Sequence, residues 1–352
     1  MKGSKELVLE YLEQELLKNN NRGLNTKEIA TALGMQRPNV STILNRLVKD
    51  GVLLKGTTRP VQYRLKEVLV DNPLDFPTIV GENGSLRPAI QLAQAAILYP
   101  NYALPVLVLS EPGSGRTYFV HKMMEFAIQN HAIGQAHLFE KINCLDYLDA
   151  LDDLLSLLFG SDTVESVFEK MAEGVLFIDN IQVLSFADQN RLVSWLNHRE
   201  EEQKKDRKKG LVVIGCDTKI SDHFSNKFPV VIQLPSYPNR PINEKLELLS
   251  YFFAIESKNA SRDIQVPRDV IPVYILSANI TNLKELEYAV RRACANAFVR
   301  SLRAGLKDLT LSIDDLPIHY QGIRHLGGHE AIKIDELIGR RKALIYDKEL
   351  GL

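Results

Sequence analysis

Residues 105–119 read PVLVLSEPGSGRTYF, and this stretch decides how the centre of the chain folds. An apolar run, residues 105–109, is followed by a glycine-rich turn and then by a segment with helical character. A strand, a glycine-rich loop and a helix in this order outline a phosphate-binding loop, G-x-x-x-x-G-K-[ST]. Two positions depart from that pattern, because Ser110 replaces the first glycine and Arg116 replaces the lysine.

Glycines in such a loop let backbone N–H groups close around phosphates at the positive end of the following helix. Gly113, Gly115 and Thr117 are kept, so we expect the backbone cradle and the magnesium-ligating hydroxyl to remain. Arg116 keeps the positive charge, but its fork cannot simply replace a lysine point charge. The predicted nucleotide-binding residues are Glu111, Pro112, Gly113, Ser114, Gly115, Arg116, Thr117, Asp179 and Asn180.

Apolar strands and amphipathic helices alternate around the loop, which predicts an α/β fold with a doubly wound, mostly parallel sheet. The stretch VLFIDN ends at residue 180, about sixty residues after the loop, and places Asp179 as the second magnesium ligand beside Thr117. An active ATPase of this type has an acid at the next position, but here it is Asn180. We therefore predict weak binding of ATP or ADP with magnesium, and loss of hydrolysis.

The first 66 residues are basic, with 12 Lys and Arg against 6 Asp and Glu, although the whole chain has a net charge of −1. Helical patterns run from residue 7, from Asn25 (a helix cap) to Gly34, and from Arg37 to Gly51. VLLKGTTRPVQYRL then predicts a hairpin, which completes a winged helix-turn-helix that binds double-stranded DNA. The predicted DNA-binding residues are Gln36, Arg37, Asn39, Ser41, Thr42, Asn45, Arg46, Lys55 and Arg59. A small protein-docking domain is the alternative.

Several motifs together resemble the sigma-54-dependent activators, in the branch typified by the levanase-operon activator. They are TTRPVQYRL, FPTIVGENGSLRPAIQLAQAAILYP, INCLDY, LFG, LFIDN, IQLPSYPNRP and NITNLKEL. The resemblance implies a winged helix at 1–66, a linker at 67–75, an AAA+ α/β core at 76–240 and a helical lid at 241–305. Residues 306–352 form a C-terminal extension.

The chain departs from this family where the family's chemistry is concentrated. Ser225-Asn226-Lys227 stands where the arginine finger is expected, and Thr281 replaces the lid's sensor arginine. Between Gly160 and Gly174 the sequence SDTVESVFEKMAE has no GAFTGA-type motif for contacting the sigma factor, and a helix fits there. We also expect the chain to lack the branch's phosphotransferase-regulated domains.

Three functions remain open. The chain is a DNA-binding transcriptional regulator in carbohydrate-related gene control, with a degenerate AAA+ domain as a nucleotide-sensing or oligomerisation scaffold. Alternatively, it is an ATP-hydrolysing sigma-54 activator, or a partner-binding subunit beside a full-length paralogue or RNA polymerase. We expect a homo-oligomer.

The composition places the chain among cytoplasmic proteins. Its apolar runs are too short to cross a membrane, and its N-terminus does not resemble a signal peptide. Cys144, Cys216 and Cys294 lack ligand spacing and are predicted to be free thiols, and no histidine pair predicts a metal site.

Overall fold

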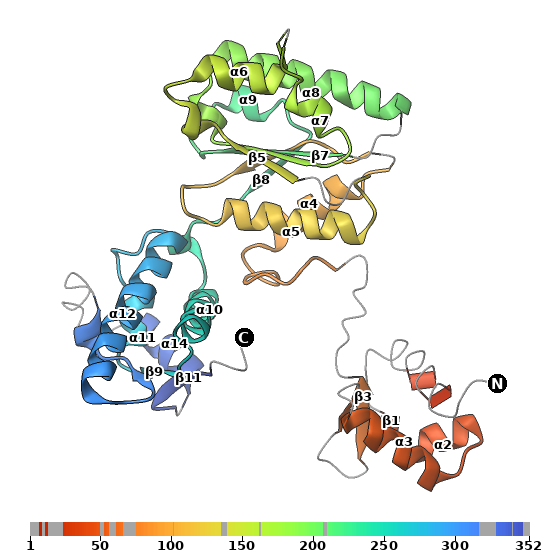
Figure 1. Cartoon of the computed structure of the whole chain (residues 1–352), viewed down its shortest axis with the longest axis vertical. Coiled ribbons are helices and arrows are strands. Elements are labelled where there is room, and N and C mark those ends of the chain that lie inside the picture. Colours follow the sequence, from red (N-terminus) through yellow and green to blue (C-terminus); the bar gives the residue numbers. More distant parts are fainter. Residues whose placement is uncertain are drawn as a thin grey trace. The chain divides into compact units, whose positions relative to one another are not determined.

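The computed structural model describes residues 7–8, 11–12, 24–49, 53–55, 61–65, 75–100, 102–134, 139–161, 163–206, 210–316, 329–339 and 341–347. The chain divides into two compact units, Met1–Asp75 and Phe76–Leu352 (Figure 1). Among the described helices, none combines the length and the apolar character that a bilayer span requires.

The first unit contains two described helices, α2 (Thr26–Leu33) and α3 (Arg37–Lys49). The predicted cap of α2 is confirmed, because the Asn25 side chain accepts hydrogen bonds from two backbone N–H groups and the Glu28 carboxylate accepts one from the Asn25 N–H. Gly34 ends the helix with a φ of 61°, a left-handed conformation that glycine adopts without steric cost.

Helix α3 is amphipathic and packs its apolar face into the core of the first unit. Val40, Leu44 and Leu47 are buried, together with Val8 and Leu12 from the predicted first helix. A small antiparallel sheet completes the unit, with strand order β1-β3-β2 (Leu24–Asn25, Gln62–Leu65 and Leu53–Lys55). Helices followed by such a hairpin form the predicted winged helix-turn-helix.

The second unit is centred on a parallel sheet of five described strands in the order β5-β6-β7-β4-β8. The strands are β4 (Val106–Leu109), β5 (Phe139–Asn143), β6 (Val175–Asp179), β7 (Leu211–Cys216) and β8 (Val230–Gln233). This arrangement confirms the doubly wound fold. Strand β5 was missed, because its sequence FEKIN contains two charged residues and few apolar ones.

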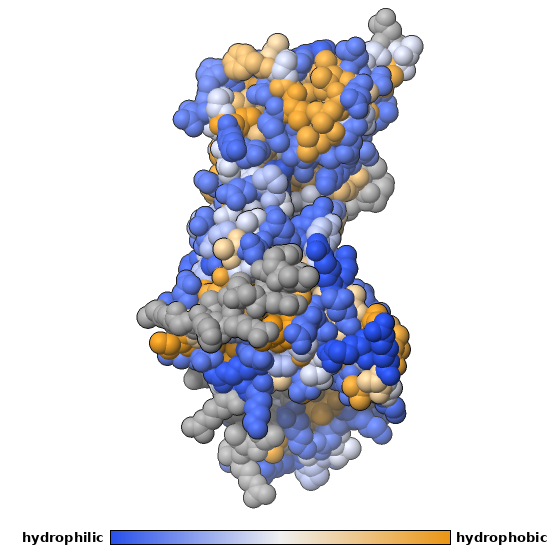
Figure 2. Space-filling view, turned by 90° about the vertical axis from the view of Figure 1, so that its left-hand side faces the viewer, coloured by the Kyte–Doolittle hydropathy of each residue, from blue (hydrophilic) through white to orange (hydrophobic). Residues whose placement is uncertain are grey.

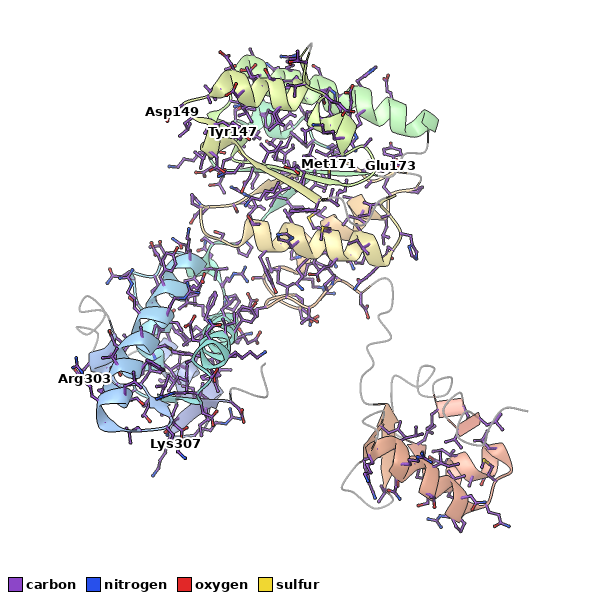
Figure 3. All side chains as sticks on the ribbon, viewed as in Figure 1. Tyr147, Asp149, Met171, Glu173, Arg303 and Lys307 are labelled. Carbon is purple, nitrogen blue, oxygen red and sulfur yellow. The ribbon has the colours of Figure 1, made fainter. Side chains whose placement is uncertain are left out.

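Helices cover both faces of the sheet (Figure 1). Helices α4 (Arg87–Ile97) and α5 (Arg116–Gln129) lie on one face. The other face carries α6 (Leu151–Phe159), α7 (Val167–Lys170), α8 (Phe186–Asp206) and α9 (Asp222–Ser225). The apolar residues of each face form a separate cluster, so side chains fill the space between the layers (Figure 3).

The stretch between α6 and β6 is a compact connection. Ser161 and Val164 exchange backbone hydrogen bonds in a turn, and the Ser166 hydroxyl caps α7. Val167 and Phe168 of that helix are buried against the core. The helix predicted between Gly160 and Gly174 is therefore present, and its last turn leads through Met171 and Glu173 into β6 (Figure 3).

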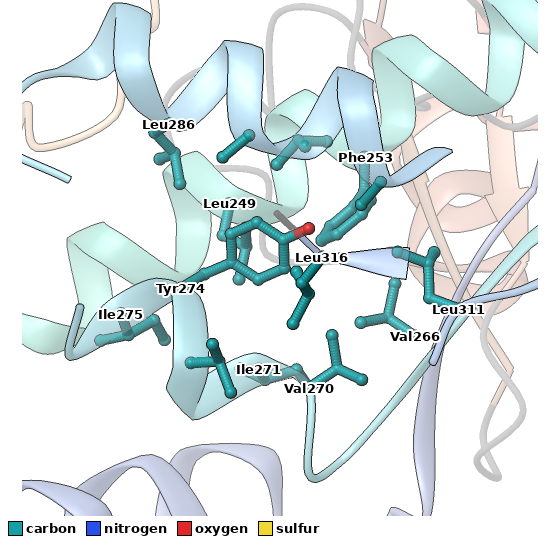
Figure 4. Close-up of a cluster of buried hydrophobic side chains, with 14 of the residues drawn as sticks. Leu249, Phe253, Val266, Val270, Ile271, Tyr274, Ile275, Leu286, Leu311 and Leu316 are labelled. Atoms are coloured by element: carbon teal, nitrogen blue, oxygen red, sulfur yellow. The ribbon is translucent and has the colours of Figure 1, made fainter. Parts of the chain in front are cut away.

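The lid is formed mainly by α10 (Ile242–Ala260), α11 (Ile271–Ile275), α12 (Leu283–Ala304) and α14 (His329–Ile338). Strand β9 (Ile264–Pro267) pairs with β10 (Leu309–Thr310) and β11 (Ala343–Tyr346). Leu311 and Leu316 pack with Phe253 and Tyr274 in one cluster (Figure 4). The described residues of 309–316, 329–339 and 341–346 thus contribute to the same core as the predicted lid at 241–305.

Candidate functional site

The glycine-rich loop lies at the carboxyl end of β4, where ligands of parallel sheets bind. Gly113 and Gly115 have φ angles of 77° and 93°, in the left-handed region that favours glycine. Helix α5 starts directly after Gly115, and no side chain caps its N-terminus. Its first N–H groups and the positive end of its dipole therefore face the loop, an arrangement that suits a phosphate.

A cavity of about 690 Å³ opens over this loop. All nine residues that the sequence predicts for nucleotide binding lie along its wall. Sequence reasoning missed another part of the wall, which comes from the segment before α4, from Arg240 and from the lid helices α10 and α12. That part of the wall includes Ile79, Val80, Arg240, Leu248, Tyr251, Phe252, Leu283, Lys284 and Glu287. Apolar side chains beside a phosphate cradle suit a planar base next to a polyphosphate.

The loop fits phosphate in a second respect. The Ser114 hydroxyl is buried and has no hydrogen-bond partner among the described residues. Buried polar atoms without partners are uncommon, so this oxygen is available to a ligand. The lid also touches the loop, because the Leu283 N–H donates to the Gly113 carbonyl at 3.1 Å. A ligand on the loop would therefore lie against the lid.

Arg116 turns away from the cradle and toward the neighbouring strand ends. Its guanidinium forms an ion pair with Asp179 at 2.6 Å and donates to Asn180 Oδ1 at 3.0 Å. The other terminal nitrogen donates to the Cys216 carbonyl and to the Ser110 hydroxyl. The side chains of Arg116 and Asp179 are only 10% and 8% exposed, so this is a nearly buried ion pair.

Asn180 is held in a left-handed conformation with a φ of 60°. Asparagine tolerates this region better than most side chains. Its amide nitrogen donates to Asn143 Oδ1 at 2.7 Å, and its amide oxygen accepts from Arg116 and Gln182. The side chain at this position is an amide, so it cannot accept a proton as a carboxylate would.

Thr117, the other predicted magnesium ligand, accepts a hydrogen bond from the Lys141 ammonium at 3.0 Å. Lys141 belongs to β5 and was missed along with that strand. The predicted role of Thr117 and Asp179 as metal ligands stays a prediction. In this structure each of them already contacts a cationic side chain, which does not suit a second cation.

A buried carboxylate connects the cavity wall to the lid. Glu244 of α10 accepts hydrogen bonds from the Ser85 N–H, at 2.7 Å, and from the Ser85 hydroxyl. It also pairs with Arg240 at 3.6 Å, and Arg240 donates to the Val80 carbonyl. Burial lowers the pKa of the Arg240 guanidinium, and the Glu244 charge opposes that shift. The glycines of VGENGS were the available sequence signal, since side chains at Gly81 or Gly84 would collide with Glu244.

Cys144, Cys216 and Cys294 are buried free thiols, as predicted. Burial is the main cause that raises the pKa of both Cys144 and Cys216 to about 12. A raised pKa favours the protonated thiol over the reactive thiolate at both positions. The described residues also contain no cluster of three or more His, Cys, Asp or Glu that could hold a metal ion.

The outer face of α3 carries the predicted DNA-binding side chains. Gln36, Arg37, Asn39, Thr42, Asn45 and Arg46 are exposed, and Ser41 is half-buried. The Lys55 ammonium from β2 donates to Asn45 Oδ1 at 2.9 Å, which brings the start of the wing to the helix. The predicted contact at Arg59 lies outside the described residues.

Together, the fold and these two surfaces define a winged helix-turn-helix unit followed by an AAA+ unit. Residues 79–214 match the family described as the Sigma-54 interaction domain, and residues 8–53 match the family described as winged helix-turn-helix DNA-binding. The first match confirms the resemblance to the sigma-54-dependent regulators over residues 79–214, and the second confirms the winged helix-turn-helix.

The chain is similar to two curated regulators. It is 28% identical over 346 residues to the transcriptional regulatory protein LevR of Bacillus subtilis, over 84% of this chain and 37% of LevR. It is 26% identical over 316 residues to the transcriptional regulatory protein DagR of Salmonella typhimurium, over 77% of this chain and 34% of DagR. The chain thus spans little more than a third of the length of these relatives.

Among solved structures, NtrX from Brucella abortus in complex with ATP superposes with a TM-score of 0.50. The two chains are 15% identical, and the match covers 86% of this chain and 68% of NtrX. At this level of identity the superposition shows a shared fold.

Proposed function

We propose that this protein is a DNA-binding transcriptional regulator whose AAA+ unit binds an adenine nucleotide. The observation that carries the DNA-binding role is the polar, exposed face of α3, which is backed by the buried Val40, Leu44 and Leu47. Arginine and asparagine are the side chains that read guanine and adenine edges in the major groove. The basic charge of residues 1–66 supports the same role, because phosphate contacts dominate DNA affinity.

The direct test is selection of bound sequences from a randomised duplex library by the full chain, followed by affinity measurements at several salt concentrations. The proposal expects an enriched motif and an affinity that falls steeply with salt. Selection of no motif, with no salt-dependent binding to any duplex, would contradict it. Similarity to LevR supports a role in carbohydrate-related genes, and a DNA-binding role implies a cytoplasmic location.

We propose ATP or ADP as the ligand of the cavity over the loop. The uncapped α5 terminus, the unpartnered Ser114 hydroxyl and the apolar wall support this ligand class, and NtrX of the same fold is known in complex with ATP. We further propose that bound ATP is not hydrolysed, since Asn180 cannot activate water and Lys227 donates to Asn190 instead of serving as an arginine finger. Calorimetric titration beside a phosphate-release assay tests both parts.

A second candidate is activation of the sigma-54 form of RNA polymerase, which the match to the Sigma-54 interaction domain favours. In the family that the sequence resembles, activators contact the sigma factor with a loop that lies between the elements equivalent to α6 and β6. In this chain the connection between α6 and β6 is compact, which argues against activation. Promoter opening in a reconstituted transcription assay, with and without ATP, separates the two functions.

We propose that the chain acts as an oligomer, with itself or with a paralogue. Exposed apolar side chains on the α/β unit support this, among them Leu145, Leu148 and Leu151, and apolar surface is visible there (Figure 2). Light scattering on purified protein should show a species larger than one chain. Leu148→Glu should shift that species toward the monomer, whereas a monomer under all conditions would contradict the proposal.

A further inference from the structure

The two residues that the sequence predicts as magnesium ligands are each bound by a cationic side chain. Arg116 pairs with Asp179 at 2.6 Å, and Lys141 donates to Thr117 at 3.0 Å. The two cations come from different elements, since Arg116 begins α5 and Lys141 lies on β5. Together they place two positive charges where a bound Mg²⁺ would place two.

The Arg116–Asp179 pair is built into the sheet. Gly215 of β7 leaves the space for it, because a Cβ at that position would overlap Asp179 Oδ1 and lie 2.9 Å from Arg116 Nε. The guanidinium is also held by the Cys216 carbonyl and the Ser110 hydroxyl. A metal on Asp179 would have to displace a nearly buried guanidinium from several acceptors at once. Removing one member of a buried ion pair is strongly unfavourable.

The same side chains bring positive charge to the cavity. Arg116 lines it and contributes its charge, while its Nε faces Gly215 of β7 and its terminal nitrogens are already bound. Lys141 is exposed, so its ammonium is free to exchange the Thr117 hydroxyl for a phosphate oxygen. Ionised donors form the stronger hydrogen bonds to phosphate. We propose that this site binds a nucleoside polyphosphate without a divalent metal, with Arg116 and Lys141 supplying the positive charge.

This inference rests on the proposed nucleotide binding, and one titration separates the two. ATP is titrated into the full chain by calorimetry, once in excess EDTA and once in excess MgCl₂. The inference expects the two dissociation constants to agree within about threefold, which is less than 1 kcal/mol. Binding that is tenfold or more tighter with magnesium would overturn the inference and leave nucleotide binding intact. No binding in either buffer would overturn both.

Variants give a second readout that does not depend on the buried pair folding correctly. Lys141→Ala should weaken ATP binding in EDTA by about tenfold, the low end for a hydrogen bond to a charged group. Lys141→Arg should restore most of it, and Lys307→Ala, an exposed lysine at the far end of the lid (Figure 3), should change nothing. An unchanged affinity for Lys141→Ala would overturn the assignment.

Asp179→Asn tests the metal directly. If Asp179 only neutralises Arg116, its replacement removes a negative charge near the phosphates, and ATP affinity should hold or rise in both buffers. A tenfold loss confined to the magnesium buffer would show that Asp179 holds a metal and would overturn the inference. Thermal unfolding of the variant shows whether the unit remains folded.

Discussion

Arg116 at the start of α5 and Asp179 at the end of β6 form an ion pair at 2.6 Å past the end of β7, and both side chains are almost fully buried. In an active nucleotide site of this kind, the residue at position 116 of the loop faces the phosphates and the aspartate at the end of β6 holds the metal. Here they face each other. The loop retains its backbone cradle, while Arg116 occupies the carboxylate that would have held a metal and also binds the end of β7.

The Arg116–Asp179 pair occupies space that a side chain at position 215 would fill, so a substitution of Gly215 tests whether the pair depends on that space. We expect Gly215→Ala to reduce the free energy of unfolding by about 1–3 kcal/mol, because overpacking a filled core forces neighbours to shift. The neighbours are Asp179 and Arg116. Gly134→Ala is the control, since its added methyl would meet its nearest neighbour, Glu173, at 3.1 Å, whereas the methyl at Gly215 would overlap Asp179 Oδ1. Equal effects of the two substitutions in denaturant unfolding would argue against a specific role for Gly215.

The backbone at residue 180 predicts the outcome of restoring the acid. Asn180 has a φ of 60°, and a glutamate there should cost about 1–2 kcal/mol of stability, since only asparagine, aspartate and glycine enter this region readily. Asn180→Glu should therefore unfold at lower temperature than Asn180→Asp, and neither should hydrolyse ATP. Restored ATP hydrolysis in Asn180→Glu would mean that the missing acid at position 180 is the sole cause of the lost hydrolysis.

The Glu244 contacts predict a link between the lid and the ligand. Glu244→Ala should lower stability by about 3–5 kcal/mol, the cost of leaving a buried partner charge unpaired. Glu244→Gln removes the charge and keeps the shape, so it should cost less. Both should weaken nucleotide binding, because Val80 lies on the cavity wall and is held through Arg240. If calorimetry showed that Glu244→Gln binds the nucleotide with unchanged affinity, the Glu244 contacts would not contribute to nucleotide binding.

Lys55 and Asn45 are hydrogen-bonded to each other, but we expect them to make different kinds of DNA contact. Asn45 should contact bases, and Lys55 should contact phosphates. Asn45→Ala and Arg46→Ala should each reduce discrimination between the selected site and random DNA by about 1–3 kcal/mol. Lys55→Ala should weaken all duplexes alike and lower the slope of log affinity against log salt by about 1. Lys307→Ala, in the other unit, is the control. If Asn45→Ala and Arg46→Ala reduced the affinity for the selected site and for random DNA equally, these residues would contact phosphates and not bases.

Much of this fold could be predicted because its signals are local. The caps at Asn25 and Gly34, the stripe on α3 and the apolar run before Ser110 depend on residues close in sequence. The doubly wound sheet followed from the alternation of strands and helices. The nine residues predicted for nucleotide binding line one cavity because the ends of parallel strands meet at one edge of the sheet.

The missed features depend on which distant segments become neighbours. Lys141 reaches Thr117 because β5 pairs with β6, and the charged sequence of β5 gave no strand pattern. The direction of the Arg116 side chain depends on the empty space at Gly215, about a hundred residues away. The lid wall depends on Glu244 meeting Ser85 across 159 residues. No local pattern encodes these contacts.

The central claim is that this AAA+ unit holds a nucleotide without consuming it. The most direct measurement is phosphate release by the full chain at an ATP concentration that calorimetry shows to be saturating, with magnesium present. The account predicts saturable binding and no release above the protein-free background. Release at about 1 per second per chain, the low end of ordinary enzyme turnover, would contradict it.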